Sequence, residues 1–249
     1  MKKLIVANWK MNPETIDEAR RIASQIEHGL LVIDRSKVEV AICPPFVFLP
    51  PLKHALHFTR LGAQDLAAES AGPYTGEVSA NQLLEFGVFL ALVGHSERRV
   101  LGEDDRLINK KMRQALEHKI EPILCVGYGT KKGMVLAAEK KIILSQLRKG
   151  LKDINERKSK FAILYEPVWA ISRGFGAGEA VAPSHAAAMM KWIKSRFPKN
   201  RILYGGSIDS RNAVGFAAES VVEGGVVGGA SLRPIEFLDI VRAFTGTHP

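Results

Sequence analysis

Short apolar segments rich in β-branched residues recur along the chain and alternate with longer amphipathic stretches. This alternation is typical of parallel strands whose connecting helices cover the sheet. The pattern predicts strands at residues 4–7, 38–42, 61–63, 89–93, 123–126, 161–164, 201–204 and 226–227.

The stretches between these strands carry helix signals. Asn12 followed by Pro13 predicts an N-cap and the start of a first helix, whose apolar face extends over residues 16–26. Ser79 followed by Gln82 is a capping-box pattern that predicts a short helix over 81–86. Further helices are predicted over 107–118, 136–151, 183–197 and 235–244.

No linker-like change in composition divides these units, which favours one domain over residues 1–249. Eight parallel βα units predict an α/β protein with a closed barrel, although an open doubly wound sheet also alternates strands and helices. A dinucleotide-binding sheet of that second kind has Gly-x-Gly-x-x-Gly at its first strand-to-helix junction. The junction here, residues 7–12, contains no glycine, and this favours the barrel.

The 249-residue chain is basic, with a formal net charge of +9. Its basic residues are scattered through amphipathic segments and form no long tract, so they predict a solvated surface and no nucleic-acid partner. The same charge would attract a phosphate-bearing substrate. No apolar run reaches membrane-spanning length, and the first one is too short for a signal peptide, which predicts a cytoplasmic protein with no membrane partner.

Cys43 and Cys125 lie far apart in sequence and belong to no metal-ligand pattern, so neither zinc nor a disulfide framework is predicted. The glycine-rich stretches 127–129 and 174–178 complete no nucleotide-binding motif, and the serine-hydrolase and zinc-protease motifs are absent from the sequence. We therefore predict neither a metal ion nor a cofactor.

Polar residues follow three predicted strands, where the side chains of a parallel barrel converge on one face. Asn8 and Lys10 lie two positions apart and therefore point the same way. His95 precedes a potential helix start at Ser96, which should keep the imidazole neutral and able to donate a hydrogen bond. Glu166 ends an apolar strand beneath a tryptophan, where desolvation makes a carboxylate a better base. Each residue alone is equally consistent with a solvated, capping or ion-paired side chain.

Glycine-rich segments follow the last two strands, at residues 205–207 and 228–231. Glycines let backbone amides approach a ligand closely, and the corresponding loops of barrel enzymes frequently hold phosphate. Tight turns would explain one such segment, whereas two at adjacent strand ends favour a phosphate site.

Five segments, in order and at barrel spacing, resemble the signature sequences of triosephosphate isomerases. They are Ala7-Asn8-Trp9-Lys10-Met11-Asn12, Gly94-His95-Ser96-Glu97-Arg98-Arg99, Tyr165-Glu166-Pro167-Val168-Trp169-Ala170-Ile171, Tyr204-Gly205-Gly206-Ser207 and Val227-Gly228-Gly229-Ala230-Ser231-Leu232. The resemblance covers essentially the whole chain. It implies a single-domain parallel (β/α)8 TIM barrel that interconverts dihydroxyacetone phosphate and D-glyceraldehyde 3-phosphate in glycolysis and gluconeogenesis, without a cofactor.

The resemblance also implies residue roles. Glu166 is expected to act as the carbon base and His95 as the electrophile, while Asn8 stabilises the enediolate oxygen and Lys10 supplies positive charge. Supporting residues are expected at Ser96 and at Glu97, which would orient Lys10. The residues implied in phosphate binding are Ser172, Ser207, Gly228 and Gly229, and those implied in a lid are Pro167, Val168, Trp169, Ala170 and Ile171.

The loop from Gln64 to Glu77 resembles a family loop that crosses into a partner subunit, which implies a homodimer. The chain has Asp65 where the family has Asn, and we expect the details of the interface to differ. It has Tyr128 where the family has an acid, and there we expect altered local hydrogen bonding with activity retained. The lid is several residues longer than the common form, and we expect the extra residues to follow its hinge.

Two other functions are weaker predictions. A different phosphate-binding barrel enzyme, such as a sugar-phosphate epimerase, would have metal-ligand histidines and acids at several strand ends, which the sequence lacks. A barrel that had lost catalysis and bound nucleic acid would not need the intact set of Asn8, Lys10, His95 and Glu166.

Overall fold

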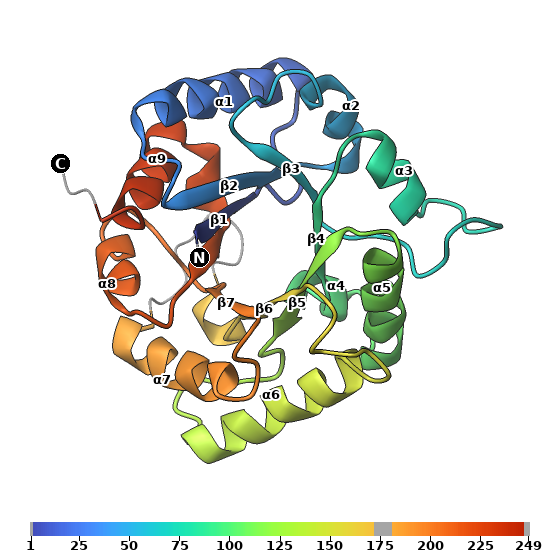
Figure 1. Ribbon diagram of the computed structural model, residues 1–249, viewed down its shortest axis with the longest axis vertical. Helices are drawn as coiled ribbons and strands as arrows, with labels where there is room; N and C mark the ends of the chain where they lie inside the picture. Colours follow the sequence, from blue (N-terminus) through green and yellow to red (C-terminus); the bar gives the residue numbers. More distant parts are fainter. Residues whose placement is uncertain (1, 172–180, 247–249) are drawn as a thin grey trace.

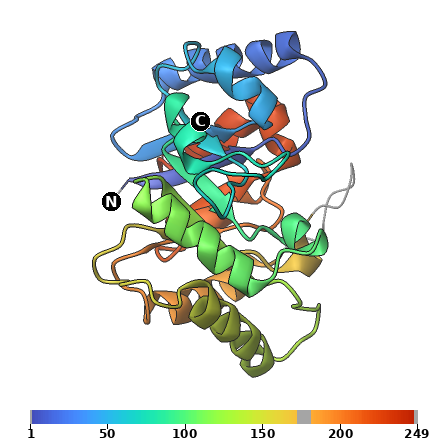
Figure 2. The same cartoon turned by 90° about the vertical axis from the view of Figure 1, so that its right-hand side faces the viewer.

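Eight parallel strands close into a barrel in which each strand pairs with the next along the chain and β8 pairs with β1. The computed structural model describes residues 2–171 and 181–246. Figure 1 shows the helices as a ring around these strands, and Figure 2 shows the same arrangement from the side. The strands are β1 (Lys3–Asn8), β2 (Val38–Cys43), β3 (Arg60–Ala63), β4 (Leu90–Val93), β5 (Glu121–Val126), β6 (Ala162–Tyr165), β7 (Arg201–Tyr204) and β8 (Gly224–Val227).

The outer ring consists of α-helices of very different lengths. They are α1 (Ile16–Gly29), α2 (Leu49–Leu52), α3 (Ala80–Glu85), α4 (Ser96–Val100), α5 (Asp105–Glu117), α6 (Leu136–Gly150), α7 (Pro183–Lys194), α8 (Ala213–Ala218) and α9 (Pro234–Ala243). Within the described ranges, none of these helices has the length and apolar character needed to cross a membrane.

The structure confirms the eight predicted strands, with ends displaced by at most two residues. It also confirms the closed barrel, because an open sheet would have two unpaired edge strands. The capping box of α3 forms as predicted: the Ser79 hydroxyl accepts from the backbone N–H of Gln82, and the Gln82 side chain accepts from the backbone N–H of Ser79.

The predicted N-cap at Asn12 is wrong. Helix α1 starts at Ile16, and the Thr15 hydroxyl accepts a hydrogen bond from the backbone N–H of Glu18 at 3.3 Å. Thr15 has extended backbone angles directly before the first helical residue, so its short side chain reaches the free amide. Asn12 lies too far upstream and instead donates to the Trp9 carbonyl.

Side chains alternate along each strand between the barrel interior and the helical layer. A compact cluster fills the interior, and it includes Leu4, Val6, Leu90, Leu92, Ala162 and Leu164. Alternate residues such as Ile163 and Tyr165 belong to the larger core between strands and helices. The period of two therefore directs the residue after β6, Glu166, to the inward side of its strand.

The buried carboxylate of Glu27 anchors the segment that leads into β3. It lies near the end of α1 and accepts backbone N–H bonds from His57, Phe58 and Thr59 at 2.7, 2.8 and 2.7 Å. The side chain therefore satisfies three donors that no strand or helix pairs.

We predict that Glu27→Gln lowers the free energy of unfolding by about 1–3 kcal/mol, because an amide NH2 replaces one accepting oxygen and leaves a buried N–H unpaired. Denaturant titration followed by circular dichroism would measure the change. The residues after β1, β4 and β6 should keep their positions, since Glu27 belongs to the outer layer. An unfolding free energy equal to that of the unmodified protein would contradict the anchoring role.

Candidate active site

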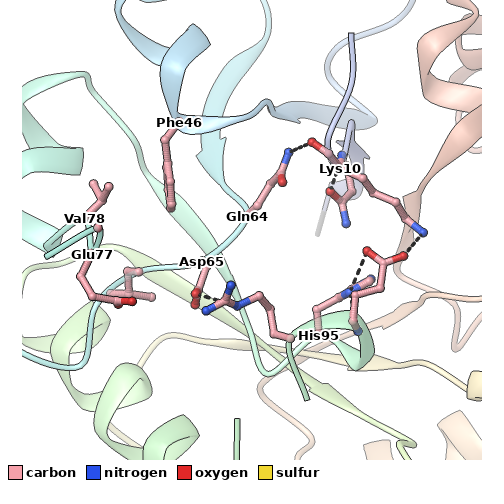
Figure 3. A pocket seen from close by; sticks show the side chains of 12 residues that line it. Lys10, Phe46, Gln64, Asp65, Glu77, Val78 and His95 are labelled. Carbon is pink, nitrogen blue, oxygen red and sulfur yellow. Dashed lines mark hydrogen bonds and ion pairs between the residues drawn. The ribbon is translucent and has the colours of Figure 1, made fainter. Parts of the chain in front are cut away.

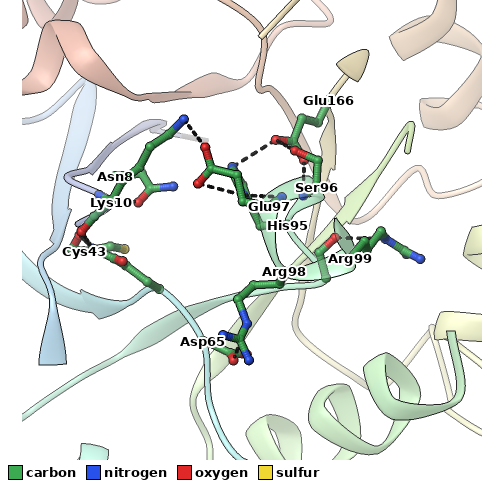
Figure 4. A network of polar contacts seen from close by, with 12 residues as sticks. Asn8, Lys10, Cys43, Asp65, His95, Ser96, Glu97, Arg98, Arg99 and Glu166 are labelled. Atoms are coloured by element: carbon green, nitrogen blue, oxygen red, sulfur yellow. Dashed lines mark hydrogen bonds and ion pairs between the residues drawn. The ribbon is translucent and has the colours of Figure 1, made fainter. Parts of the chain in front are cut away.

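The carboxyl ends of β1, β4 and β6 bring Asn8, His95 and Glu166 to one face of the barrel (Figure 4). All three are buried, with exposed fractions of 4%, 7% and 2%. His95 Nε2 lies 2.9 Å from Glu166 Oε1. The fold thus brings together side chains from separate strand ends, and it desolvates the pair that could exchange a proton.

Lys10 follows β1 and extends over the same face. Its Nζ lies 2.6 Å from Glu97 Oε1. Its φ of +53° is a left-handed conformation that lysine rarely adopts. Its amide donates to Asn8 Oδ1 at 3.1 Å, and its carbonyl accepts from Gln64 Nε2 at 2.8 Å. These contacts hold a strained backbone in place, as is common at functional sites.

Helix α4 begins at Ser96, directly after His95, as predicted. His95 is its N-cap, and the ring Nδ1 accepts from the backbone N–H of Glu97 at 3.3 Å. A ring nitrogen that accepts this bond carries no proton, so the hydrogen-bond pattern assigns the proton of the neutral ring to Nε2. The ring therefore directs its N–H toward Glu166.

Opposing influences act on the protonation of His95. Burial disfavours the imidazolium, but the charge of Glu166 and its hydrogen bond to the ring outweigh burial and raise the pKa of His95. The neutral ring expected from the helix start therefore stays a prediction. The fold adds an opposing influence, because it places the Glu166 carboxylate beside the ring.

Three donors surround the Glu166 carboxylate. Ser96 donates through its backbone N–H at 3.1 Å and through its hydroxyl at 2.9 Å, and His95 Nε2 is the third donor. The carboxylate is thus held at the first residue of α4, where free helix amides favour negative charge.

The residues expected to bind phosphate lie on the loops after β7 and β8. The amide and the hydroxyl of Ser207 both donate to the Ala170 carbonyl, at 3.0 and 2.9 Å. Gly228 and Gly229 precede and open the 3₁₀ helix η4 (Gly229–Leu232). A Cβ on Gly228 would lie 3.5 Å from Lys10 Cε. The structure thus places Ser207 against the predicted hinge and Gly228 against Lys10.

The hinge residues lie directly after Glu166. Pro167 leads into the 3₁₀ helix η3 (Val168–Ala170), which contains Trp169, and Ile171 follows it. Ser172 and the lengthened part of the lid up to residue 180 lie outside the described residues.

A cavity of about 170 Å³ opens beside Lys10 and His95 (Figure 3). Phe46, Gln64 and Asp65 contribute to its opposite wall, together with the end of the loop that runs to residue 77. The cavity therefore lies between the catalytic face and the loop expected to contact a partner subunit.

Sequence reasoning missed the role of Gly127, which follows β5. Its φ is +123°, and a Cβ at this position would lie 2.3 Å from the Glu166 carbonyl oxygen. The Gln146 side chain on α6 accepts from the Gly127 amide at 2.8 Å and donates to the Tyr128 carbonyl at 2.7 Å. Only glycine permits this approach to the strand end that carries Glu166.

The departure at Asp65 places a carboxylate in a buried cluster of charges. Lys111 Nζ lies 2.7 Å from both Asp65 oxygens and 2.5 Å from Glu103 Oε1, and Arg98 contacts both acids. Burial raises the pKa of Asp65 to about 6, although the charge of Lys111 acts in the opposite direction. These contacts tie the start of the loop to α4 and α5.

Among the described residues, no three His, Cys, Asp or Glu side chains are grouped so as to hold a metal ion.

Comparison with known proteins places similarity along almost the entire chain. A family model described as triosephosphate isomerase matches residues 3–244. A triosephosphate isomerase from Aquifex aeolicus is 40% identical, with 98% of this chain and 100% of the relative covered. One from Caldanaerobacter subterraneus subsp. tengcongensis is 38% identical, with 97% and 99% covered.

We predict that Glu166→Gln lowers the pKa of His95 in the ligand-free protein, because the substitution removes the strongest influence that favours the imidazolium. Titration of the ring ¹⁵N shifts by NMR in both proteins would measure the change. The histidines distant from Glu166 provide an internal reference. An unchanged titration of His95 would contradict the charge coupling.

We also predict that Gly127→Ala lowers turnover by about tenfold or more, since the methyl group must displace the backbone that carries Glu166. Gly129→Ala is the matched control, because Gly129 also has a positive φ, of +88°, but a Cβ there meets no atom within 4 Å. Equal turnover in the two variants would show that backbone strain, and not the clash, determines the effect. Steady-state kinetics on folded protein would make the comparison.

Proposed function

The chain belongs to the triosephosphate isomerase family, and on this premise we propose how its residues divide the chemistry of the reaction. The protein is an aldose–ketose isomerase that interconverts dihydroxyacetone phosphate and D-glyceraldehyde 3-phosphate. The observation that carries the residue assignment is the buried contact of 2.9 Å between Glu166 and His95. A carboxylate base paired with a neutral histidine is the established pattern for this reaction.

In this proposal Glu166 removes the proton from the carbon beside the carbonyl group. Its burial keeps bulk water away from the carboxylate, so the carboxylate can contact the substrate directly. Substrate binding must draw it away from Ser96 and His95, whose three donors hold it in the ligand-free protein. The base then returns the proton to the neighbouring carbon, so the protein ends each turnover unchanged.

His95 and Asn8 stabilise the oxygen that gains negative charge in the enediolate. The His95 Nε2–H is free to donate to that oxygen once Glu166 has moved to the substrate. Once Glu166 has moved, its negative charge no longer favours the imidazolium, so we expect His95 to react as a neutral ring. Lys10 adds fixed positive charge, and Glu97 orients it through the 2.6 Å ion pair.

Phosphate binds to Ser207 and to the amides of Gly228 and Gly229, with a further contact from Ser172. The Ser207 hydroxyl has one hydrogen, which it donates to Ala170 in the ligand-free protein. If a phosphate oxygen accepts the hydrogen bond from this hydroxyl, the Ala170 carbonyl loses the bond. Phosphate binding is thereby linked to movement of the hinge, Pro167 to Ile171, which closes the site and excludes water.

We extend the proposal to assembly: the chain forms a homodimer through the loop from Gln64 to Glu77. Residues 70–77 of this loop are exposed in the single chain, and Figure 1 shows the connection between β3 and α3 projecting from the barrel. The cavity beside Lys10 offers a place for the partner's loop, and the neighbouring Met11 is 92% exposed. We further propose one domain over residues 1–249 and a cytoplasmic location. The buried free thiols of Cys43 and Cys125 support the location, because the cytoplasm is reducing.

We predict that Glu166→Gln lowers turnover by at least about 10²–10⁴-fold, because it removes the base and keeps the side-chain volume. The inhibition constant of inorganic phosphate should stay close to that of the unmodified protein. A coupled assay with glyceraldehyde 3-phosphate would measure both constants. Turnover within tenfold of the unmodified protein would refute the role of Glu166.

We predict that Tyr74→Glu, at the tip of the exposed loop, weakens the dimer, because it places a charge in the contact with the partner. Analytical ultracentrifugation at micromolar concentration would detect the shift toward monomer, together with lower activity. Val32→Glu is the control, since Val32 is 81% exposed and belongs to the 3₁₀ helix η1 (Leu30–Val32), outside the loop. An unmodified protein that is monomeric and fully active would rule out the proposed assembly.

A further inference from the structure

A buried carboxylate on α6, Glu139, has no part in the mechanism above. It is 2% exposed, although it lies in the first turn of a helix whose first two residues, Leu136 and Ala137, are exposed. Its Oε1 accepts a hydrogen bond from the Tyr165 hydroxyl at 2.5 Å, and its Oε2 lies 3.9 Å from His185 Nε2. Burying a carboxylate is costly, and the two contacts join Glu139 to β6 and to α7.

Tyr165 is the residue before Glu166 at the end of β6. The two side chains leave opposite faces of the strand, so Tyr165 enters the helical layer while Glu166 points to the catalytic face. Burial, followed by the bond to Glu139, raises the pKa of Tyr165 far above its usual value, so the phenol stays protonated and donates. This directional bond fixes the backbone from which Glu166 projects.

The second contact of Glu139 leads to the other side of Glu166. His185 lies on α7, and its ring packs edge-on against Trp169 with a centroid separation of 6.5 Å and an angle of 67°. Trp169 belongs to η3, just beyond Glu166. The Glu139 carboxylate therefore contacts Tyr165, the residue before Glu166, directly. Through His185 it also reaches Trp169, which follows Glu166 in sequence.

Glu139 is the buried acid that the helical layer places against the end of β6. It comes from α6, the helix that follows β5. We propose that Glu139 is a positioning residue for the catalytic base Glu166, acting through Tyr165 and His185. The inference rests on the proposed role of Glu166.

The test compares Glu139→Leu, Glu139→Gln and Tyr165→Phe at a temperature well below unfolding. We expect Glu139→Leu and Tyr165→Phe to lower kcat about tenfold, because a small displacement of the base slows proton transfer. Inhibition by inorganic phosphate should be unchanged, whereas 2-phosphoglycolate, whose planar anionic carboxylate is chemically similar to the enediolate, should bind more weakly. Glu139→Gln keeps an accepting oxygen for Tyr165, and it should recover part of kcat relative to Glu139→Leu.

Glu27→Gln is the matched control, since it also alters a buried, hydrogen-bonded carboxylate on an outer helix. It should lower thermal stability and leave kcat and both inhibition constants unchanged. If Glu139→Leu does not fold, Tyr165→Phe and Glu139→Gln decide the question, because both keep the packing. The double variant Glu139→Gln with Tyr165→Phe should be no slower than Tyr165→Phe alone if the two residues act through one bond.

Two results would overturn the inference. The first is a kcat within about twofold of the unmodified protein in the folded variants, since a displaced base should cost more than that. The second is a loss of both kcat and inorganic phosphate binding that correlates, among the variants, with the loss of thermal stability. A purely structural role would give that result. Failure of the proposed function can be distinguished from these results, because Glu166→Gln would then retain turnover.

Discussion

The alternation of side chains along parallel strands is the constraint on which the rest of the structure depends. In a closed barrel each strand has one face toward the interior and one toward the helices, and a shift of one residue would exchange them. In β6 this alternation continues from Leu164 inward, through Tyr165 outward, to Glu166 inward. The catalytic face is therefore coupled to the helical layer, because the residue that anchors the strand end and the residue that reacts are adjacent in sequence.

The ligand-free site is a set of competing contacts around one carboxylate. Glu166 is satisfied by Ser96 and His95, and in that position it favours the protonated form of the histidine. When the carboxylate moves to a substrate, burial and the start of α4 remain, and both favour the neutral ring. In the proposed mechanism, movement of Glu166 to the substrate therefore also lowers the proton affinity of His95, so the base and the electrophile are prepared together.

The elements and most site residues could be predicted because their signals are local. Strands follow from short apolar runs, and the polar residues after β1, β4 and β6 follow from their places at strand ends. The first N-cap was misplaced because Asn12 and Thr15 both suit the role, and backbone angles decide between them. The proton affinity of His95, the glycine requirement at Gly127 and the contacts of Glu139 depend on partners distant in sequence, which no local pattern contains.

Helix α4 connects the proposed subunit contact to the catalytic face. Its N-cap is His95 and its first residue, Ser96, holds Glu166, while Arg98 within the same five residues contacts Asp65 at the start of the projecting loop. Asp65 is further fixed by Lys111, and both side chains are buried, so a displaced loop would leave these two charges unpaired in a region of low dielectric. That cost is lowest when loop and helix keep their relative position. A partner subunit that immobilises the loop therefore also immobilises the backbone that aims His95 and Ser96, which gives a physical reason for assembly even though one chain supplies every reacting group.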